Sequence, residues 1–360
     1  MSIKKTKALF VCRGSVKDGL GHVIRSRCVA GAMREFCTTK MVVIGDESAE
    51  NLLVNQDLDY TITPYDQHAL NHFRHFAPDV VVFDMMHFEE EQFETIKKNT
   101  CRTVSLSPIF NCLARIDLMF HRTKVRGKDW PTGSDGPVIR CGLEYAIIGD
   151  HCRQITEETY RSNLEHETLS VAISMGGADA ANKTLAILNK IKEVPDKVLF
   201  WALLGEGYAH SYEDLVRCIR GSKHEIILAK TNDSMWRILN TCSLVILAGG
   251  TTTYEAVYAG LPSVNTLDTE VHYFLIQELV ERGACAYSGY TFEESLHALR
   301  GIITRYSRHR EKLLEMKERS RDLIDGDGAR RVAEEIATFC QQQRKESPHE
   351  PTRIPAILSR

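Results

Sequence analysis

The sequence contains no apolar run of the ~18–20 residues that a membrane-spanning helix needs. It has eleven cysteines, an odd number, and none are spaced as C-x-x-C, so neither a disulfide framework nor a zinc knuckle is indicated. Excess charge is also missing, because a formal net charge of −3 gives no electrostatic reason to expect nucleic acid as a partner. These absences indicate a cytoplasmic protein with no integral membrane segment.

What is present is an alternation of apolar strands and helical segments across 360 residues. The runs Ala8–Cys12, Thr39–Ile44 and Val80–Asp84 predict strands, and the alternation restarts at Leu169–Met175. Such alternation is typical of parallel sheets covered by helices, so the predicted fold class is α/β with two doubly wound, Rossmann-like domains facing a cleft. We expect an N-terminal domain over residues 1–165, a C-terminal domain with trailing helices over 166–342, and a polar tail over 343–360.

The most informative stretch, Gly249–Pro262, follows the apolar run Ser243–Ala248. Here Gly250, Thr251 and Thr252 lead from a buried strand into a helix, where backbone N–H groups and the helix dipole can receive an anion. Glu255 is expected in the first turn, where its carboxylate can accept bonds from two adjacent sugar hydroxyls. The alternative is a capping box, with Thr252 as N-cap and Glu255 three residues on.

A second glycine-rich loop, Arg13–Arg25, follows the first strand and opens a helix. Gly21 lets the backbone approach a ligand closely. His22 lies near the helix N-terminus, where the dipole disfavours imidazolium, so a neutral general base is predicted. The alternative is a histidine that only caps or packs. Arg25 is predicted either to bind a phosphate or to pair with an acid.

Two further strand ends carry candidate residues. Gly176 and Gly177 stand between a strand and a helix and are predicted to hold a diphosphate on backbone N–H groups. Asp84 ends a buried strand, and it is predicted either to face the cleft as a catalytic carboxylate or to cap the next helix. We predict no cofactor, and no metal site is expected, because the histidines at 68, 72 and 75 have no obvious acidic or thiol partner.

Four ordered blocks resemble the UDP-2,4-diacetamido-2,4,6-trideoxyhexose hydrolases of pseudaminic acid biosynthesis, which are related to the peptidoglycan N-acetylglucosaminyltransferase. The blocks are Gly19–Arg25, Val138–Ile148, Ser174–Asp179 and Gly249–Pro262. The resemblance implies a GT-B fold with a UDP-sugar bound between the domains. It also implies that His22 helps water attack the anomeric carbon, and that Glu255 holds the ribose.

The first-domain loops depart from that family. Met86 stands where an aromatic residue is usual, and Ser107-Pro108-Ile109 replaces an acidic pair. The Asn-Gln that usually follows the Gly-Leu-Pro strand is absent, and the roles of nearby Glu270 and of His87 are not predicted. The nucleotide half therefore matches the family better than the sugar half.

Three functions follow from these patterns. The first is a hydrolase that releases UDP and a free amino sugar in surface-glycan or nonulosonic-acid-type biosynthesis. The second is a glycosyltransferase with the same donor site, and the third is an inactive subunit that only binds a nucleotide sugar. UDP release without an acceptor separates the first from the second. The sequence does not determine the sugar, the nucleotide base or the oligomeric state.

Overall fold

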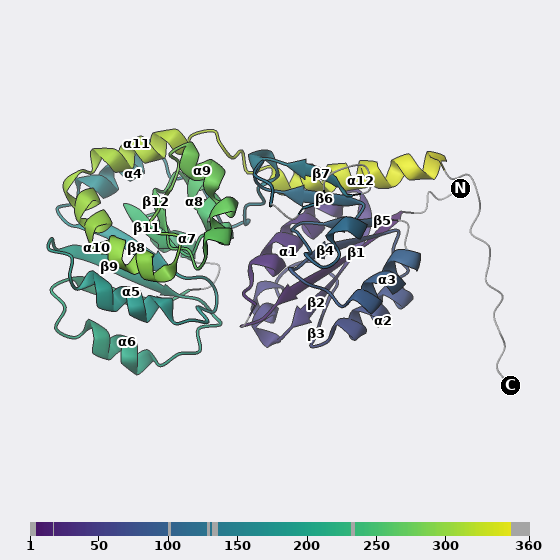
Figure 1. Ribbon diagram of the computed structural model, residues 1–360, viewed down its shortest axis with the longest axis horizontal. Helices are drawn as coiled ribbons and strands as arrows, with labels where there is room; N and C mark the ends of the chain where they lie inside the picture. The colour runs from purple at the N-terminus through teal and green to yellow at the C-terminus, as the bar shows by residue number, and fades with distance from the viewer. Residues whose placement is uncertain are drawn as a thin grey trace.

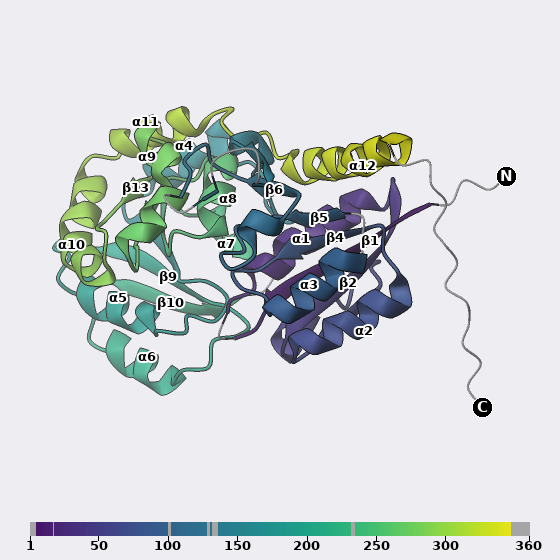
Figure 2. The ribbon, with the colours of Figure 1, turned by 45° about the vertical axis from the view of Figure 1, so that its right-hand side comes forward.

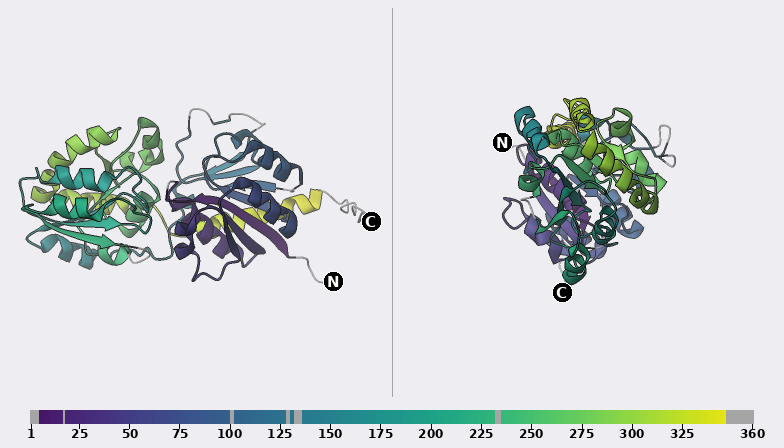
Figure 3. Two further views of the ribbon diagram at one scale, coloured as in Figure 1. Left: turned by 90° about the horizontal axis from the view of Figure 1, so that it is seen from below. Right: turned by 90° about the vertical axis from the view of Figure 1, so that its left-hand side faces the viewer.

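Two parallel sheets with flanking helices lie side by side (Figure 1). The computed structural model describes residues 5–346 apart from 17, 100–101, 128–129, 132–135 and 232–234. Figures 2 and 3 show from other sides that the first half of the chain forms one lobe and most of the second half forms the other. The predicted fold class, two Rossmann-like α/β domains, is confirmed.

In the described part of the chain the first sheet has seven parallel strands in the order β3-β2-β1-β4-β5-β6-β7. Their bounds are β1 Thr6–Gly14, β2 Cys37–Gly45, β3 Tyr60–Thr63, β4 Val80–Asp84, β5 Arg102–Ser105, β6 Leu118–His121 and β7 Val138–Cys141. β4 is buried at every residue, because helices cover the sheet on both faces.

The helices of the first domain divide between these two faces. α1 (Gly21–Met33) contributes to one apolar cluster, and α2 (Asp66–Phe76) and α3 (Glu90–Asn99) contribute to another. Short 3₁₀ turns occupy Glu47–Leu52, Leu113–Arg115 and Leu143–Tyr145. α1 begins at the carboxyl edge of the sheet, and this start holds His22 and the loop before it at that edge.

The second sheet has six parallel strands among the described residues, in the order β10-β9-β8-β11-β12-β13. Their bounds are β8 Leu169–Ser174, β9 Val198–Leu204, β10 Glu225–Lys230, β11 Leu244–Leu247, β12 Ser263–Asn265 and β13 Ala286–Tyr287. The helices are α4 Glu157–Glu165, α5 Lys183–Ile191, α6 Tyr212–Ile219, α7 Met235–Leu239, α8 Thr251–Ala259, α9 Gln277–Glu281, α10 Phe292–Arg308 and α11 Glu311–Ser320, with a 3₁₀ turn at Glu270–Leu275.

The last helix, α12 (Gly328–Glu346), returns to the first domain, where it runs beside α1 (Figure 1). Its apolar residues Val332, Ala333, Ile336 and Cys340 join the cluster on the α1 face of the first sheet. The prediction placed this segment in the second domain and began a polar tail at residue 343. The correction has a physical reason: the apolar stripe of α12 fills the part of the sheet face that α1 leaves uncovered.

Each sheet has one point at which the strand order reverses, between β1 and β4 in the first and between β8 and β11 in the second. Ligands of open parallel sheets bind beyond the carboxyl ends of the strands at such points. The loops after these four strands carry most of the predicted site residues. The topology therefore brings the candidate loops of each domain together at one edge of its sheet.

Candidate functional site

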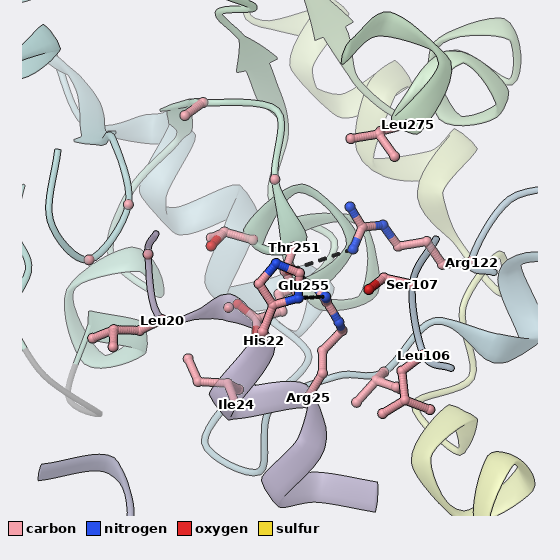
Figure 4. A pocket seen from close by; sticks show the side chains of 18 of the residues that line it. Leu20, His22, Ile24, Arg25, Leu106, Ser107, Arg122, Thr251, Glu255 and Leu275 are labelled. Carbon is pink, nitrogen blue, oxygen red and sulfur yellow. Dashed lines mark hydrogen bonds between the residues drawn. The ribbon is translucent and has the colours of Figure 1, made fainter. Parts of the chain in front are cut away.

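A cavity of about 530 Å³ lies between the two domains and is lined by loops from both. This volume is within the range of small-molecule sites. Nine of the ten predicted site residues line it: Gly21, His22, Arg25, Gly176, Gly177, Gly250, Thr251, Thr252 and Glu255. Figure 4 shows His22, Arg25, Thr251 and Glu255 in one view. The strand-end turns of both domains therefore meet at a single cavity.

His22, the second residue of α1, contacts the carboxylate at the end of β4. Its Nδ1 lies 2.7 Å from Asp84 Oδ1. Arg25 Nη2 also lies 2.7 Å from this nitrogen, but Nδ1 cannot donate to Asp84 and accept from Arg25 at once. We assign Nδ1–H as a donor to Asp84, since Arg25 Nη2 already donates to Asp84 Oδ1 at 2.7 Å. His22 then presents Nε2 as an acceptor, which is the arrangement a general base requires.

Asp84 is fully buried and accepts hydrogen bonds from three side chains. Arg25 donates through Nε at 3.0 Å and Nη2 at 2.7 Å, and Ser107 Oγ donates at 2.8 Å. Burial alone would raise the pKa of Asp84, but the charge of Arg25 and the hydrogen bonds from His22 and Arg25 hold it well below its usual range. The carboxylate therefore stays ionised at neutral pH.

Asp84 does not line the cavity, and its exposed fraction is 0%. Both sequence-based alternatives, a carboxylate facing the cleft and a cap for the next helix, need correction. The side chain points toward α1 because His22 and Arg25, on successive turns of that helix, both present donors to it. His22, Arg25 and Ser107 contact Asp84 and line the cavity, so we expect Asp84 to act on a ligand through them, as a positioning residue.

The N-terminus of α8 forms the opposite wall. Its N-cap is Gly250, and no side chain caps the helix. Thr251 Oγ1 accepts a hydrogen bond from Arg25 Nη1 at 3.0 Å, which joins the two domains across the cavity. An uncapped helix N-terminus with a guanidinium beside it favours an anion.

Glu255 lies on the second turn of α8 rather than the first, because the helix begins at Thr251. The capping-box alternative is therefore wrong. The carboxylate is buried, and Oε1 accepts the backbone N–H of Gly149 at 3.3 Å. Burial raises the pKa of Glu255 to about 7, against an ordinary value of 4.5, although the Gly149 hydrogen bond opposes the shift. The carboxylate has room for further donors from a ligand, because it lines the cavity.

This raised pKa predicts that the ligand-free protein loses stability as the pH rises. The folded state holds the Glu255 proton more tightly than the unfolded state, so the advantage is full below about pH 4.5 and is lost as the pH rises through about 7. The loss in free energy of unfolding is on the order of 3 kcal/mol, at about 1.4 kcal/mol per pKa unit. Urea unfolding at pH 5, 6, 7 and 8 measures it. Glu255→Gln should flatten the profile by that amount, and parallel profiles for the two proteins would refute the assignment.

The loop at Gly176 and Gly177 lines the cavity, but α5, the helix after it, differs from the prediction. Gly176 has φ +92°, a conformation that favours glycine. The carboxylate of Asp179 accepts the backbone N–H groups of Lys183 and Thr184, both at 2.8 Å. The N-terminus of α5 is thus capped by its own loop, so a ligand in this cavity meets the N-termini of α8 and α1, neither of which is capped by a side chain.

Several residues of the cavity were not predicted from the sequence. Ser107 was noted only as a departure from a family pattern, yet it holds Asp84. His121 and Arg122 stand at the end of β6, a strand that was not predicted, because it has only four residues within a loop-rich stretch. Its signal was the short apolar run Leu118–Phe120 just before them.

The structure separates the remaining histidines near the strand ends. His87 is exposed and is not part of the cavity lining, whereas His272 lines it. The side chain of Glu270 is outside the described residues. The described part of the chain contains no group of three or more His, Cys, Asp or Glu residues able to hold a metal ion. Across the same residues, no helix combines the length and the apolar character needed to cross a membrane.

Two proteins are similar to this chain in sequence. It is 21% identical over 344 residues to the spore coat polysaccharide biosynthesis protein SpsG of Bacillus subtilis, a match covering 92% of this chain and 97% of SpsG. It is 23% identical over 274 residues, 74% of its length, to the uncharacterized protein MJ1062 of Methanocaldococcus jannaschii, of which the match spans only 56%. No protein-family model matches the chain.

Three solved structures share this fold, and two of them contain UDP or UDP-GlcNAc. MurG of Acinetobacter baumannii aligns over 92% of this chain and 99% of its own, with a TM-score of 0.65 and 15% identity. MnaA of S. aureus, solved with UDP, aligns over 97% of this chain and 100% of its own, with a TM-score of 0.65 and 13% identity. The UDP-GlcNAc 2-epimerase of Neisseria meningitidis, bound to UDP-GlcNAc, aligns over 92% of this chain and 100% of its own. The TM-score is 0.62 and the sequence identity is 12%. At these identities the likeness shows the fold, which is GT-B.

Proposed function

We propose that this protein binds a UDP-sugar in the cavity between its domains and cleaves the bond between the sugar and UDP. Water is the proposed acceptor, which makes the protein a nucleotide-sugar hydrolase acting on an amino sugar. The observation that carries the proposal is the position of His22. This histidine is oriented by an ionised carboxylate and faces, across one cavity, an uncapped helix N-terminus and a buried glutamate. The name of SpsG supports a place in polysaccharide biosynthesis, and the neighbours solved with UDP or UDP-GlcNAc support a UDP-sugar as the ligand.

The chemistry divides between the two walls. His22 Nε2 takes a proton from water as the water oxygen forms a bond to the anomeric carbon. The bond from that carbon to the oxygen of the β-phosphate breaks, and the electron pair leaves with UDP. The N-terminus of α8, at Gly250 and Thr251, stabilises the charge that develops there. Asp84 stabilises the imidazolium that forms on His22.

A second candidate is a glycosyltransferase that passes the same sugar to a hydroxyl group. Two apolar side chains that line the cavity, Met86 and Phe110, are also 43% and 46% exposed, which suits an acceptor larger than water. The likeness in fold to the glycosyltransferase SnogD of Streptomyces nogalater supports this candidate as well. The third candidate is an inactive binding subunit. It does not account for the hydrogen bond between His22 and Asp84, because binding alone needs no oriented base.

Release of UDP from a panel of UDP-amino sugars, with no acceptor added, tests the proposal. We expect wild-type protein to release UDP and a free sugar in equal amounts from at least one member of the panel. Binding without release would favour the transferase, and the panel would then be repeated with sugar and glycan acceptors. Absence of both binding and release for every UDP-sugar would refute the proposal.

Glu255→Ala is expected to weaken UDP binding by about 1–3 kcal/mol, the scale of lost hydrogen bonds to a buried charged group. In the proposed complex this carboxylate accepts both ribose hydroxyls of UDP. Titration calorimetry with UDP and 2′,3′-dideoxy-UDP measures the effect. The variant should bind the two ligands equally well, whereas wild type should prefer UDP. Equal preference for UDP in both proteins would remove the ribose role.

A further inference from the structure

Two consecutive residues at the end of β6, His121 and Arg122, line the cavity but have no role in the mechanism above. Both come from the first domain. Figure 4 shows that the Arg122 side chain extends toward Thr251, on the opposite wall. They are the strongest unexplained polar groups of the cavity.

Arg122 carries a guanidinium that is not in contact with any carboxylate of the described residues. It lies over the ring of Tyr254, 4.7 Å from the centroid, and Nη1 lies 3.5 Å from Thr251 Oγ1. Its Nε is buried without a hydrogen-bond partner. Within the described residues, Arg122 forms no ion pair with a carboxylate, whereas Arg25 is paired with Asp84. A guanidinium stays protonated in proteins, so this desolvated charge favours an anionic ligand.

His121 supplies an independent sign of a ligand. Its side chain is only 4% exposed, and Nε2 is buried with no hydrogen-bond partner. The ring packs edge-on against Trp130, with centroids 4.7 Å apart, and is stacked on Phe274 at 6.0 Å. Burial, with help from the charges of Arg122 and Arg25, lowers the pKa of His121 to about 3, so it adds no positive charge. Native proteins leave few buried polar atoms unpaired, and two adjacent cases in one cavity indicate a ligand rich in oxygen acceptors.

We propose that Arg122 binds the β-phosphate of the nucleotide and stabilises it as the leaving group. This inference rests on the proposed function and deepens it. Three groups meet at Thr251: the uncapped N-terminus of α8, the paired guanidinium of Arg25 and the unpaired guanidinium of Arg122. Such a convergence matches a diphosphate, which carries one negative charge on each phosphate and gains another on cleavage, better than a sugar carboxylate, which helix N–H groups and one arginine would already satisfy.

The position of Arg122 also predicts which part of the nucleotide it contacts. Arg122 belongs to the first domain and Thr251 to the second, so an anion between them contacts both. The β-phosphate is the group next to the sugar, and it gains charge when the bond to the anomeric carbon breaks. A nucleoside monophosphate lacks that group. Arg122 should therefore separate UDP from UMP, whereas Glu255 should not.

Titration calorimetry with UDP and UMP, in EDTA, tests this assignment on wild type, Arg122→Met and Arg126→Gln. Arg126 is exposed in the loop after β6 and serves as the matched charge control. We expect Arg122→Met to lose about 10- to 100-fold in UDP affinity, the range for hydrogen bonds to a charged group, and to keep UMP affinity within about twofold. Unchanged UMP affinity also shows that the variant is folded. Arg126→Gln should bind both ligands like wild type.

Arg122→Lys keeps the charge but loses the two-pronged geometry, and it is expected to recover part of the UDP affinity. Equal losses for UDP and UMP in Arg122→Met, or no loss for either, would overturn the role of Arg122 and leave the proposed function standing. Failure of wild type to bind either nucleotide would instead overturn the proposed function, and this inference with it.

Discussion

His22→Ala is expected to slow UDP release by about 10²–10⁴-fold while UDP affinity stays within about twofold. The proposed step needs a base to take a proton from the attacking oxygen, and His22 has the side chain oriented for it. Its Nδ1 is engaged by Asp84 at 2.7 Å, so Nε2 is the nitrogen left for the reaction. The proposed nucleotide contacts are made by Glu255, the N-terminus of α8 and Arg122, and the substitution leaves all three in place.

The measurement is steady-state UDP release from the best substrate of the panel, with UDP affinity determined by calorimetry on the same samples. Added imidazole should restore part of the rate in His22→Ala, because a free base can occupy the space that the side chain leaves. His75→Ala, on α2 and outside the cavity lining, is the matched control and should keep the wild-type rate. A fully active His22→Ala would remove the general-base assignment.

Asp84→Asn is expected to reduce the rate by about 10³–10⁴-fold, the scale seen when a catalytic histidine loses the carboxylate that orients it. The amide cannot stabilise an imidazolium, and its NH₂ group can force His22 to accept at Nδ1, the wrong tautomer for catalysis. The substitution also leaves the guanidinium of Arg25 without its carboxylate, so the free energy of unfolding should fall by about 3–5 kcal/mol. Urea unfolding measures that loss.

A double variant separates positioning from general damage. If Asp84 acts through His22, His22→Ala combined with Asp84→Asn should be no slower than the worse single variant, because residues that act as a unit are not additive. Ser107→Ala, which removes one hydrogen bond but keeps the carboxylate, should cost much less than Asp84→Asn. Additive losses in the double variant would show that Asp84 does not act through His22.

The elements that carry the site were readable from local pattern. The strand Val80–Asp84 has the predicted bounds, because its apolar run ends at a polar residue. The turns at Gly21, Gly176 and Gly250 were found for the same reason. Alternating strands and helices fix a parallel sheet with its loops at one edge.

The pairing of these groups was not readable. Whether Asp84 faces a ligand or α1 depends on which strands are neighbours, and β1 lies beside β4 only once the sheet has formed. Arg25 meets Thr251 across 226 positions of the sequence, and α12 crosses back to the first domain. That no carboxylate of the described residues contacts Arg122 is likewise a result of the folded surroundings. The sequence by itself determined most of the strands, turns and helices, because short-range sterics and periodicity decide those, although the short strand β6 was not found. Long-range packing decided which side chain each buried charge contacts, since burial and charge compensation exist only in the assembled fold.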